Sequence, residues 1–282
     1  FSRQQLWQVV PLQSARHAAD TGIKGCAGIL RRTQRTVRSL IDIMTAQIPQ
    51  IDTPFTALAI ETATALSTVA VCHEGYVHSS ALSGTRPGAG EVYAKIDGLM
   101  AKAGIVPTDL KCIAFGCGPG GFTGVRIAAA VSQGLAYGLQ IPVFRYSTLG
   151  LLAAGVGAAC EESVVIAAGL DARQGEAYVG FYRIIDGRPE ALVPDALVIP
   201  GQFNLNAFAE QHGVPGVFLA GPAWSMYPDL LQGGSELVVA DNADCLPRAD
   251  DLLSLARHAF MSGELSDAFA AQPNYLRDKV TY

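Results

Sequence analysis

The residues best suited to chemistry form a glycine-rich stretch, 116–126, between an apolar run and a long helical pattern. Five glycines within nine positions let the backbone approach another backbone or a ligand where any side chain would collide. Amides at the start of the following helix could hold an anion. Gly116, Gly118 and Gly121 also match G-x-G-x-x-G, a weak signal by itself, and no G-x-x-x-x-G-K-[ST] phosphate loop is present. The stretch therefore predicts either an anion-binding loop or a tight turn that packs a helix against a strand.

Two side chains within the stretch are further candidates. Cys117 is either a thiol activated at a helix N-terminus or an inert packed thiol, and we favour the packed thiol. Arg126 lies one turn into the helix, where it either points at a phosphate or, as we favour, braces the loop and a carboxylate of the same chain. No G-x-S-x-G pattern occurs, so Ser132 and Ser147 are not credible nucleophiles.

The histidines and cysteines predict no metal site. The chain has five histidines and six cysteines, but no histidine pair has the spacing of metal ligands on a helix. The cysteines show no C-x-x-C pattern and look like the reduced core thiols of a cytosolic protein.

Two successive sets of elements must position these residues. The first set is a three-strand meander, a helix, the strand before the glycine stretch, the helix after it, a strand and a last helix capped by Ser147. We expect these elements at 57–60, 67–72, 76–82, 91–103, 111–116, 122–137, 141–145 and 147–158.

The second set repeats the opening of the first. A strand at 164–170 ends in Asp171 and leads through a turn into a second strand, just as the strand at 57–60 ends in Glu61, and the two acids are 110 residues apart. The remaining expected elements are strands at 177–185, 217–220 and 237–240, helices at 203–212 and 250–261, and an extended tail from 272 to 280. The repeat predicts an α/β fold made of duplicated βββαβαβα-type lobes.

Charge and composition divide the chain further. Residues 1–50 form a basic extension or linker with seven Lys or Arg against two acids, while the first lobe (51–158) and the second lobe (159–282) together carry 13 against 23. Because residues 51–282 carry this excess of acidic side chains, we expect them to bind nucleic acid poorly by themselves. Residues 1–43 are translated upstream sequence, a targeting peptide or a basic arm, and we assign them no function.

Hydrophobic residues make up 50% of the chain and charged ones 16%, below the roughly 25% usual for soluble domains. This balance leaves apolar surface for a partner. Because no apolar run reaches the roughly 18 residues of a bilayer span and no secretory signal opens the chain, we expect a soluble cytoplasmic protein without a membrane contact.

The helices at 91–103 and 122–137 form the predicted partner surface, although simple core packing is the alternative. The first carries an apolar face, and the second carries a run of small side chains that would let another helix pack closely. The predicted interface residues are Val92, Ile96, Leu99, Ala129, Ser132 and Ala136. We expect pairing with a similar lobe or a homodimer, over roughly 1,600 Å² or more. A charge introduced at Ala129 or Ala136 should then abolish pairing and leave the fold soluble.

Two lobes that flank a cleft and each begin with an acid-tipped hairpin resemble the actin-like ATPase and sugar-kinase (ASKHA) superfamily. In that superfamily the glycine turns face a nucleotide between the lobes. The resemblance makes Glu61 and Asp171 candidate lobe-cleft acids for a hydrated Mg²⁺, and the alternative is that both are solvated carboxylates or caps at strand ends.

Six motifs then resemble the bacterial TsaB (YeaZ) family from about residue 57 to the C-terminus. They are Ala59-Ile-Glu-Thr-Ala-Thr64, Gly116-x-Gly-Pro-Gly-Gly-Phe-Thr-Gly-Val-Arg-Ile127, Gln133-Gly-Leu-Ala136, Ser147-Thr-Leu149, Asp171-Ala-Arg173 with Gly175-Glu176, and Tyr275-Leu-Arg277. The glycine motif is the specific one, a phosphate-loop-like or structural motif that consists of Gly118, Pro119, Gly120, Gly121, Phe122, Thr123, Gly124 and Arg126.

The resemblance implies a non-catalytic scaffold that helps to place threonylcarbamoyl on N6 of adenosine 37 in tRNAs reading codons that begin with A. Such a subunit pairs with its catalytic paralogue TsaD through a helical bundle of the first lobe, works with the ATPase TsaE, and meets tRNA only through the complex. It implies no cofactor for the chain alone, with ATP or ADP considered only at the partner interface.

One segment departs from the family pattern. TsaD binds its metal through H-x-x-x-H near the start of the first-lobe helix, and residues 86–94 of this chain contain no histidine. Members of the TsaB family often keep one histidine about where Gly88 stands, so this chain differs even from them.

Two enzyme functions remain as alternatives. An ATP-dependent phosphotransferase or hydrolase of the same superfamily would use Glu61, Asp171 and the glycine turn. An NADP-dependent oxidoreductase would use G-x-G-x-x-G with Arg145, although a strand meander before the glycine turn is not how a Rossmann fold begins.

Overall fold

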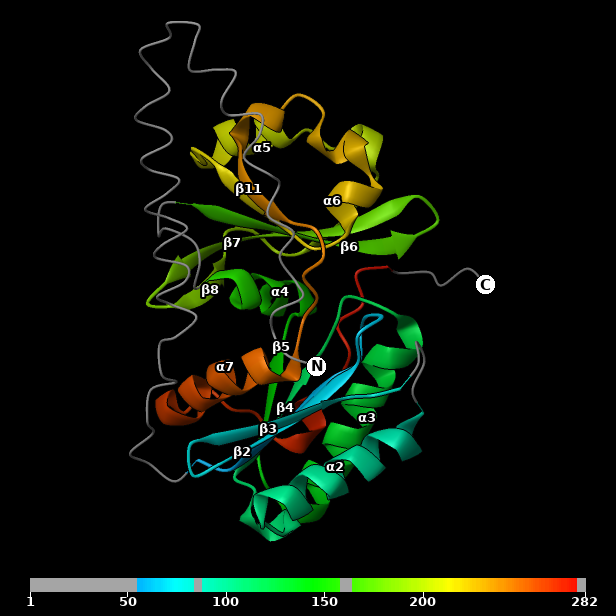
Figure 1. Ribbon diagram of the computed structural model, residues 1–282. Coiled ribbons are helices and arrows are strands. Elements are labelled where there is room, and N and C mark those ends of the chain that lie inside the picture. The colour runs from blue at the N-terminus through cyan, green and yellow to red at the C-terminus, as the bar shows by residue number, and fades with distance from the viewer. Residues whose placement is uncertain (1–54, 84–87, 158–163, 278–282) are drawn as a thin grey trace, which may run out of the picture. The chain divides into compact units, whose positions relative to one another are not determined.

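The computed structural model describes residues 55–83, 88–157 and 164–277, which belong to one compact unit, Pro49–Tyr282 (Figure 1). The predicted basic extension at 1–50 lies outside the described residues. Its assignment as an extension therefore stays a prediction.

The first sheet has five strands in the described part of the chain, in the order β3-β2-β1-β4-β5. The strands are β1 (Ala57–Glu61), β2 (Thr68–His73), β3 (Tyr76–Ala81), β4 (Cys112–Gly116) and β5 (Val143–Tyr146). β1, β2 and β3 form an antiparallel meander, whereas β4 runs parallel to β1 and β5 parallel to β4. The predicted meander and the two strands that follow it are confirmed.

The second sheet repeats this order. Its strands are β6 (Val165–Arg173), β7 (Glu176–Ile185), β8 (Arg188–Ala191), β9 (Ala196–Val198), β10 (Val217–Ala220) and β11 (Val238–Asn242). The described strands lie in the order β8-β7-β6-β10-β11, with β9 beside β7. β6, β7 and β8 form the meander and β10 and β11 the parallel part, so the predicted duplication of the lobe is confirmed.

Helices cover both sheets. The α-helices of the described residues are α2 (Ala89–Ala103), α3 (Phe122–Leu139), α4 (Thr148–Gly157), α5 (Leu205–His212), α6 (Ala223–Met226) and α7 (Ala249–Ser262). Short 3₁₀ helices are η2 (Pro107–Asp109), η3 (Pro200–Gln202), η4 (Pro228–Leu231), η5 (Ser235–Leu237) and η6 (Ala268–Ala270).

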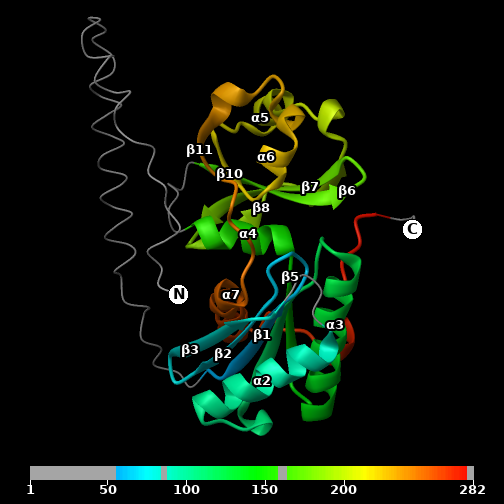
Figure 2. The same cartoon turned by 45° about the vertical axis from the view of Figure 1, so that its right-hand side comes forward.

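Alternate residues of β1 serve the two faces of the first sheet. Leu58 and Ile60 pack in one core cluster with α2 and α3, and Ala57 and Ala59 pack in another with α7. Figures 1 and 2 show α2 and α3 on one side of this sheet and α7 on the other. The layers are therefore helix, sheet and helix.

The last helix of each half packs on the sheet of the other half. Leu149 and Leu152 of α4 join the core cluster of the second sheet, whereas Leu252 of α7 joins that of the first sheet. The predicted division after residue 158 assigned α4 to the first lobe and α7 to the second, whereas each helix packs on the sheet of the other lobe. The difference arises because α4 has eight buried residues out of ten, and a helix that is apolar nearly all round needs cover on several sides.

Candidate functional site

The glycine turn between β4 and α3 is packed against the loop that follows β1. The Gly121 amide donates to the carbonyl of Ala63 at 2.7 Å, and the Thr62 hydroxyl donates to the carbonyl of Gly124 at 2.7 Å. These bonds join the start of α3 to the end of the first strand. The turn thus places α3 directly beside the first β-hairpin.

Glycine is required in this turn by the chain's own packing. A methyl group at Gly116 would lie 1.7 Å from Oε2 of Glu61, and one at Gly124 would lie 1.8 Å from the carbonyl oxygen of Thr62. A methyl group at Gly120 would lie 2.5 Å from the carbonyl oxygen of Ala63. Of the two interpretations of the stretch, the coverage of these glycine faces by the same chain favours the tight packing turn.

Glu61 lies beneath this turn. Its side chain is fully buried, its Oε1 accepts from the Ala63 amide at 2.6 Å, and its Oε2 has no hydrogen-bond partner among the described residues. Burial raises the pKa of the carboxyl to about 7, although the Ala63 amide opposes the shift. The predicted hydrated Mg²⁺ does not fit here, since the carboxylate is packed against Gly116 and has no exposed surface for hydrating waters.

Asp171, at the matching point of the second half, lies two residues before the end of β6, which runs to Arg173 and not only to the predicted residue 170. Its Oδ1 accepts from the Arg173 amide and from the Tyr227 hydroxyl, both at 2.7 Å, and the residue is half-buried. The bond to the carboxylate raises the pKa of Tyr227. The arrangement corresponds to the strand-end cap, the second of the two interpretations of this acid.

Arg126 braces the molecule through aromatic rings. Its guanidinium carbon lies 3.6 Å from the centroid of the Phe122 ring and 5.6 Å from that of Tyr275, and its Nε donates to the Tyr275 hydroxyl at 2.7 Å. The favoured bracing role is thus observed, and among the described residues the bracing partners are aromatic rings and a hydroxyl and not the expected carboxylate. Tyr275, which the sequence pattern gave only as part of a tail motif, takes that place.

Cys117 is a packed thiol. It is buried within the first core cluster, and burial raises the pKa of its thiol although Arg145 opposes the shift. A thiol held in its neutral form is a poor nucleophile, as the favoured interpretation expected.

The six predicted interface residues lie inside the chain's own core. Their exposed fractions are at most 6%, and five of the six belong to or pack within the cluster beneath α2 and α3. They are Val92, Ile96, Leu99, Ala129, Ser132 and Ala136. Side chains this buried cannot form a contact surface, so the choice of these residues was wrong. The alternative of simple core packing explains them, because the apolar period marks the face toward the sheet.

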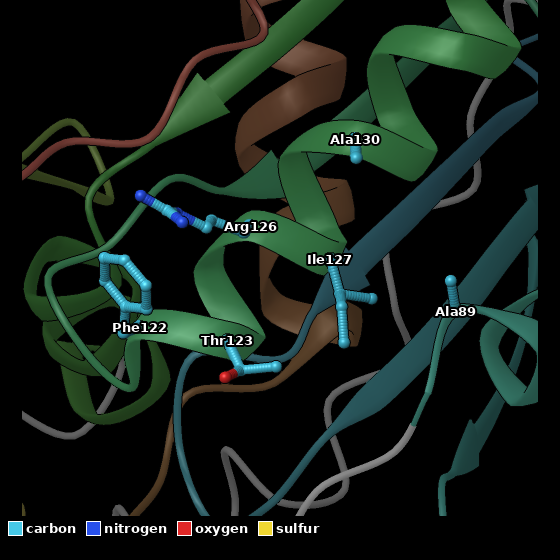
Figure 3. Close-up of a pocket in the computed structure, with 6 residues that line it drawn as sticks. All are labelled: Ala89, Phe122, Thr123, Arg126, Ile127 and Ala130. Carbon is cyan, nitrogen blue, oxygen red and sulfur yellow. The ribbon is translucent and has the colours of Figure 1, made fainter.

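The outward face of α3 instead borders a pocket of about 390 Å³ near the start of α2 (Figure 3). Figure 3 shows Phe122, Thr123, Arg126, Ile127 and Ala130 projecting from successive turns of α3. Large aromatic side chains are also exposed nearby, since Tyr137 near the end of α3 is 65% exposed and packs edge-on against Phe269, which is 66% exposed. Spacing of three and four residues along α3 could have indicated this face.

A partly buried polar cluster joins the two halves, and nothing in the sequence pattern indicated it. The hydroxyls of Ser147 and Tyr182 both donate to the carboxylate of Asp195. Ser147 also accepts from the amides of Leu149 and Gly150 at 3.2 and 3.3 Å, which confirms its predicted role as the cap of α4. Burial raises the pKa of the Asp195 carboxyl, and the two hydroxyl donors oppose the shift.

The described residues include no group of three or more histidine, cysteine, aspartate or glutamate side chains placed to hold a metal ion. Among the same residues, none of the helices combines the length and the hydrophobicity that a membrane span requires. The antiparallel meander beside β1 also differs from the parallel order of a Rossmann fold, which removes the basis for the NADP-dependent alternative.

The two repeated sheets, the acids at or near the ends of their first strands and the glycine turn define a two-lobed α/β protein of the actin-like ATPase and sugar-kinase class. Residues 91–280 match the family model described as TsaD: tRNA N6-adenosine threonylcarbamoyltransferase. Over 227 residues, 80% of this chain and 96% of the relative, the chain is 33% identical to the tRNA threonylcarbamoyladenosine biosynthesis protein TsaB of Escherichia coli (strain K12). The chain belongs to the TsaB family.

Two further comparisons agree. The Haemophilus influenzae protein of the same description is 29% identical over 238 residues, 80% of this chain and 95% of that protein. The solved structure of YeaZ from Pseudomonas aeruginosa is 36% identical with a TM-score of 0.68, over 79% of this chain and all of that one. The family resemblance carried by the six motifs is confirmed.

Proposed function

We propose that this chain acts in the cytoplasm as a non-catalytic scaffold and activator in the threonylcarbamoylation of N6 of adenosine 37 in tRNA. It pairs with the catalytic subunit TsaD, works with TsaE, and meets tRNA only through that complex. The observation that carries the proposal is the closed glycine turn, whose inner faces are covered by Glu61, Thr62 and Ala63 of the same chain. In a relative of ATP-using enzymes, a turn filled in this way favours a structural role.

The proposed docking surface is the outward face of α3 with the start of α2. The pocket there is lined mainly by apolar atoms of Phe122, Ile127 and Ala130, with Arg126 at its rim. Exposed apolar surface suits a protein partner. The net charge of the chain, −5, disfavours direct contact with the negative backbone of tRNA. A second copy of this chain is the competing occupant.

We further propose that the chain alone binds no cofactor and that any nucleotide binds at the interface with TsaD. Support comes from the first lobe, where the carboxylate of Glu61 is enclosed and the glycine turn is packed. Calorimetry of the isolated chain with Mg·ATP tests the point. Tight binding at one site of the isolated chain would favour the phosphotransferase alternative.

Reconstitution tests the function itself. TsaD, TsaE, threonylcarbamoyl-AMP and substrate tRNA are incubated with and without this chain, and formation of modified adenosine is followed by mass spectrometry of nucleosides. We expect the product to depend on the chain. An unchanged rate in its absence would refute the proposal.

Two consecutive alanines of α3, one exposed and one buried, test the surface. Ala130 is exposed at the pocket and Ala129 is buried, so Ala130→Arg should keep the fold and weaken TsaD binding about ten-fold or more, whereas Ala129→Glu should prevent folding. Ala207→Arg, at an exposed position of α5, is the matched control. Loss of self-association in Ala130→Arg with normal TsaD binding would assign the surface to a second copy.

A further inference from the structure

The segment 272–277, here called the C-terminal strap, is attached at one end to the glycine turn. The Asn274 amide donates to the carbonyl of Cys117 at 2.6 Å. The next residue, Tyr275, accepts from Nε of Arg126 and places its ring 6.0 Å from that of Phe122. A backbone bond and an aromatic contact therefore fix this end of the strap to the first half of the fold.

The other end of the strap is attached to the β6–β7 hairpin of the second half. Arg277 donates to the carbonyl of Ala172 at 3.1 Å and to Oε1 of Gln174 at 2.7 Å, and it forms an ion pair with Glu176. Arg277 and Glu176 retain only 19% and 26% of their side-chain exposure, so the pair is partly shielded from solvent. One guanidinium thus holds both strands of the hairpin.

These attachments differ in kind from the buried junction between β5 and α4. There, Ser147 and Asp195, both partly buried, form a cluster with the buried Tyr182. The strap instead lies at the surface, with Tyr275 47% exposed, and Figures 1 and 2 show it passing beside α3 toward the end of β6. A surface tie can be released without opening the core.

We propose that the C-terminal strap is a clasp that couples the glycine turn of the first half to the β6–β7 hairpin of the second, with Tyr275 and Arg277 as its positioning residues. The proposal stands on these contacts and not on the function proposed above. Because Arg126 lines the pocket on α3 and also donates to Tyr275, the clasp connects the rim of that pocket to the second half of the fold.

Hydrogen–deuterium exchange of the full chain, read by mass spectrometry, tests the coupling. Arg277 contacts the hairpin and not the glycine turn, so a clasp predicts that Arg277→Gln raises exchange about ten-fold at both the hairpin (171–177) and the turn (116–122). Tyr275→Phe, which removes the hydroxyl at the other end, should raise exchange at the same two segments. Glu176→Gln breaks the same ion pair from the hairpin side and replaces Arg277→Gln if that variant fails to fold.

Arg248→Gln is the matched control, because Arg248 pairs with Asp250 at 3.1 Å outside the strap. We expect it to leave exchange at both segments unchanged. Exchange that rises only at the hairpin in Arg277→Gln, and only at the turn in Tyr275→Phe, would show two independent local anchors and overturn the clasp.

Discussion

The first strands of the two halves, β1 and β6, both carry a carboxylate at or near their C-terminal end, but the two carboxylates have opposite surroundings. Glu61 is fully buried with one oxygen that lacks a partner among the described residues, and its pKa is raised to about 7. Asp171 is half-buried and accepts from an amide and from the hydroxyl of Tyr227. The same position in a repeated topology therefore supports two different chemical environments.

The cause is the segment that follows the neighbouring parallel strand in each half. After β4, Gly116 and Gly124 let the turn close onto the residues at the end of β1. After β10, α6 instead brings Trp224 onto Gly169, where the indole donates to the carbonyl of Ala167 at 2.8 Å. The glycine turn encloses Glu61 in the first half. In the second half, Trp224 covers β6 but leaves Asp171 partly exposed.

Gly124→Ala should produce the largest effect, because it breaks the closure that distinguishes the first half. The added methyl would lie 1.8 Å from a backbone carbonyl oxygen that cannot rotate away, so we expect a loss of at least about 4 kcal/mol in the free energy of unfolding. Urea denaturation followed by circular dichroism measures it. Gly98→Ala in α2 is the control, since a methyl there meets nothing within 4 Å among the described residues and should be neutral or slightly stabilising. Similar losses in both variants would contradict the packing argument.

Glu61→Gln should produce the next largest effect, and it depends on pH. The folded-state pKa of about 7 lies above the ordinary value of about 4.5 for a glutamate carboxyl, so between these pH values the folded state keeps a proton that the unfolded state has released. Wild-type stability should therefore fall as pH rises from about 4.5 to about 7, by on the order of 3 kcal/mol, and level off above. Glu61→Gln should lack this component in denaturation series at several pH values. An unchanged pH dependence in the variant would show that Glu61 ionises normally.

Asp171→Asn should have the smallest effect, about 1 kcal/mol, because the residue is only half-buried and the amide keeps an acceptor for the hairpin. Its specific signature is at Tyr227, whose pKa is raised by the carboxylate and should fall toward its ordinary value in the variant. Ultraviolet titration of the phenols, with Tyr227→Phe to assign the signal, measures the shift. A Tyr227 pKa that does not change would separate the two residues and remove the contrast with Glu61.

Much of the fold could be predicted from local patterns. The continuous apolar run of β1, the positive φ turn at Glu74 and Gly75, and the cap at Ser147 all follow from short-range preferences of neighbouring residues. The order of the motifs also indicated the family and the duplication. These features depend on few residues at fixed spacing.

The candidate site was predicted only in part. The periodicity of α2 and α3 identified their apolar faces, but it could not say that Val92 and Ala136 would be covered by the first sheet of the same chain. Asp195 carried no local signal, and Tyr275 was indicated only as part of a tail motif. Each acts through side chains of other elements: Arg126 for Tyr275, and Ser147 and Tyr182 for Asp195.

By itself, the sequence determined most of the elements, their order and the repeat, since these follow from backbone sterics and from the spacing of apolar side chains. The short elements β8, β9 and α6 were not predicted. Only the tertiary structure decided which sheet α4 and α7 cover, how deeply Glu61 is buried and which residue braces Arg126. The physical reason is that burial and hydrogen-bond partners are properties of segments that meet from distant parts of the chain.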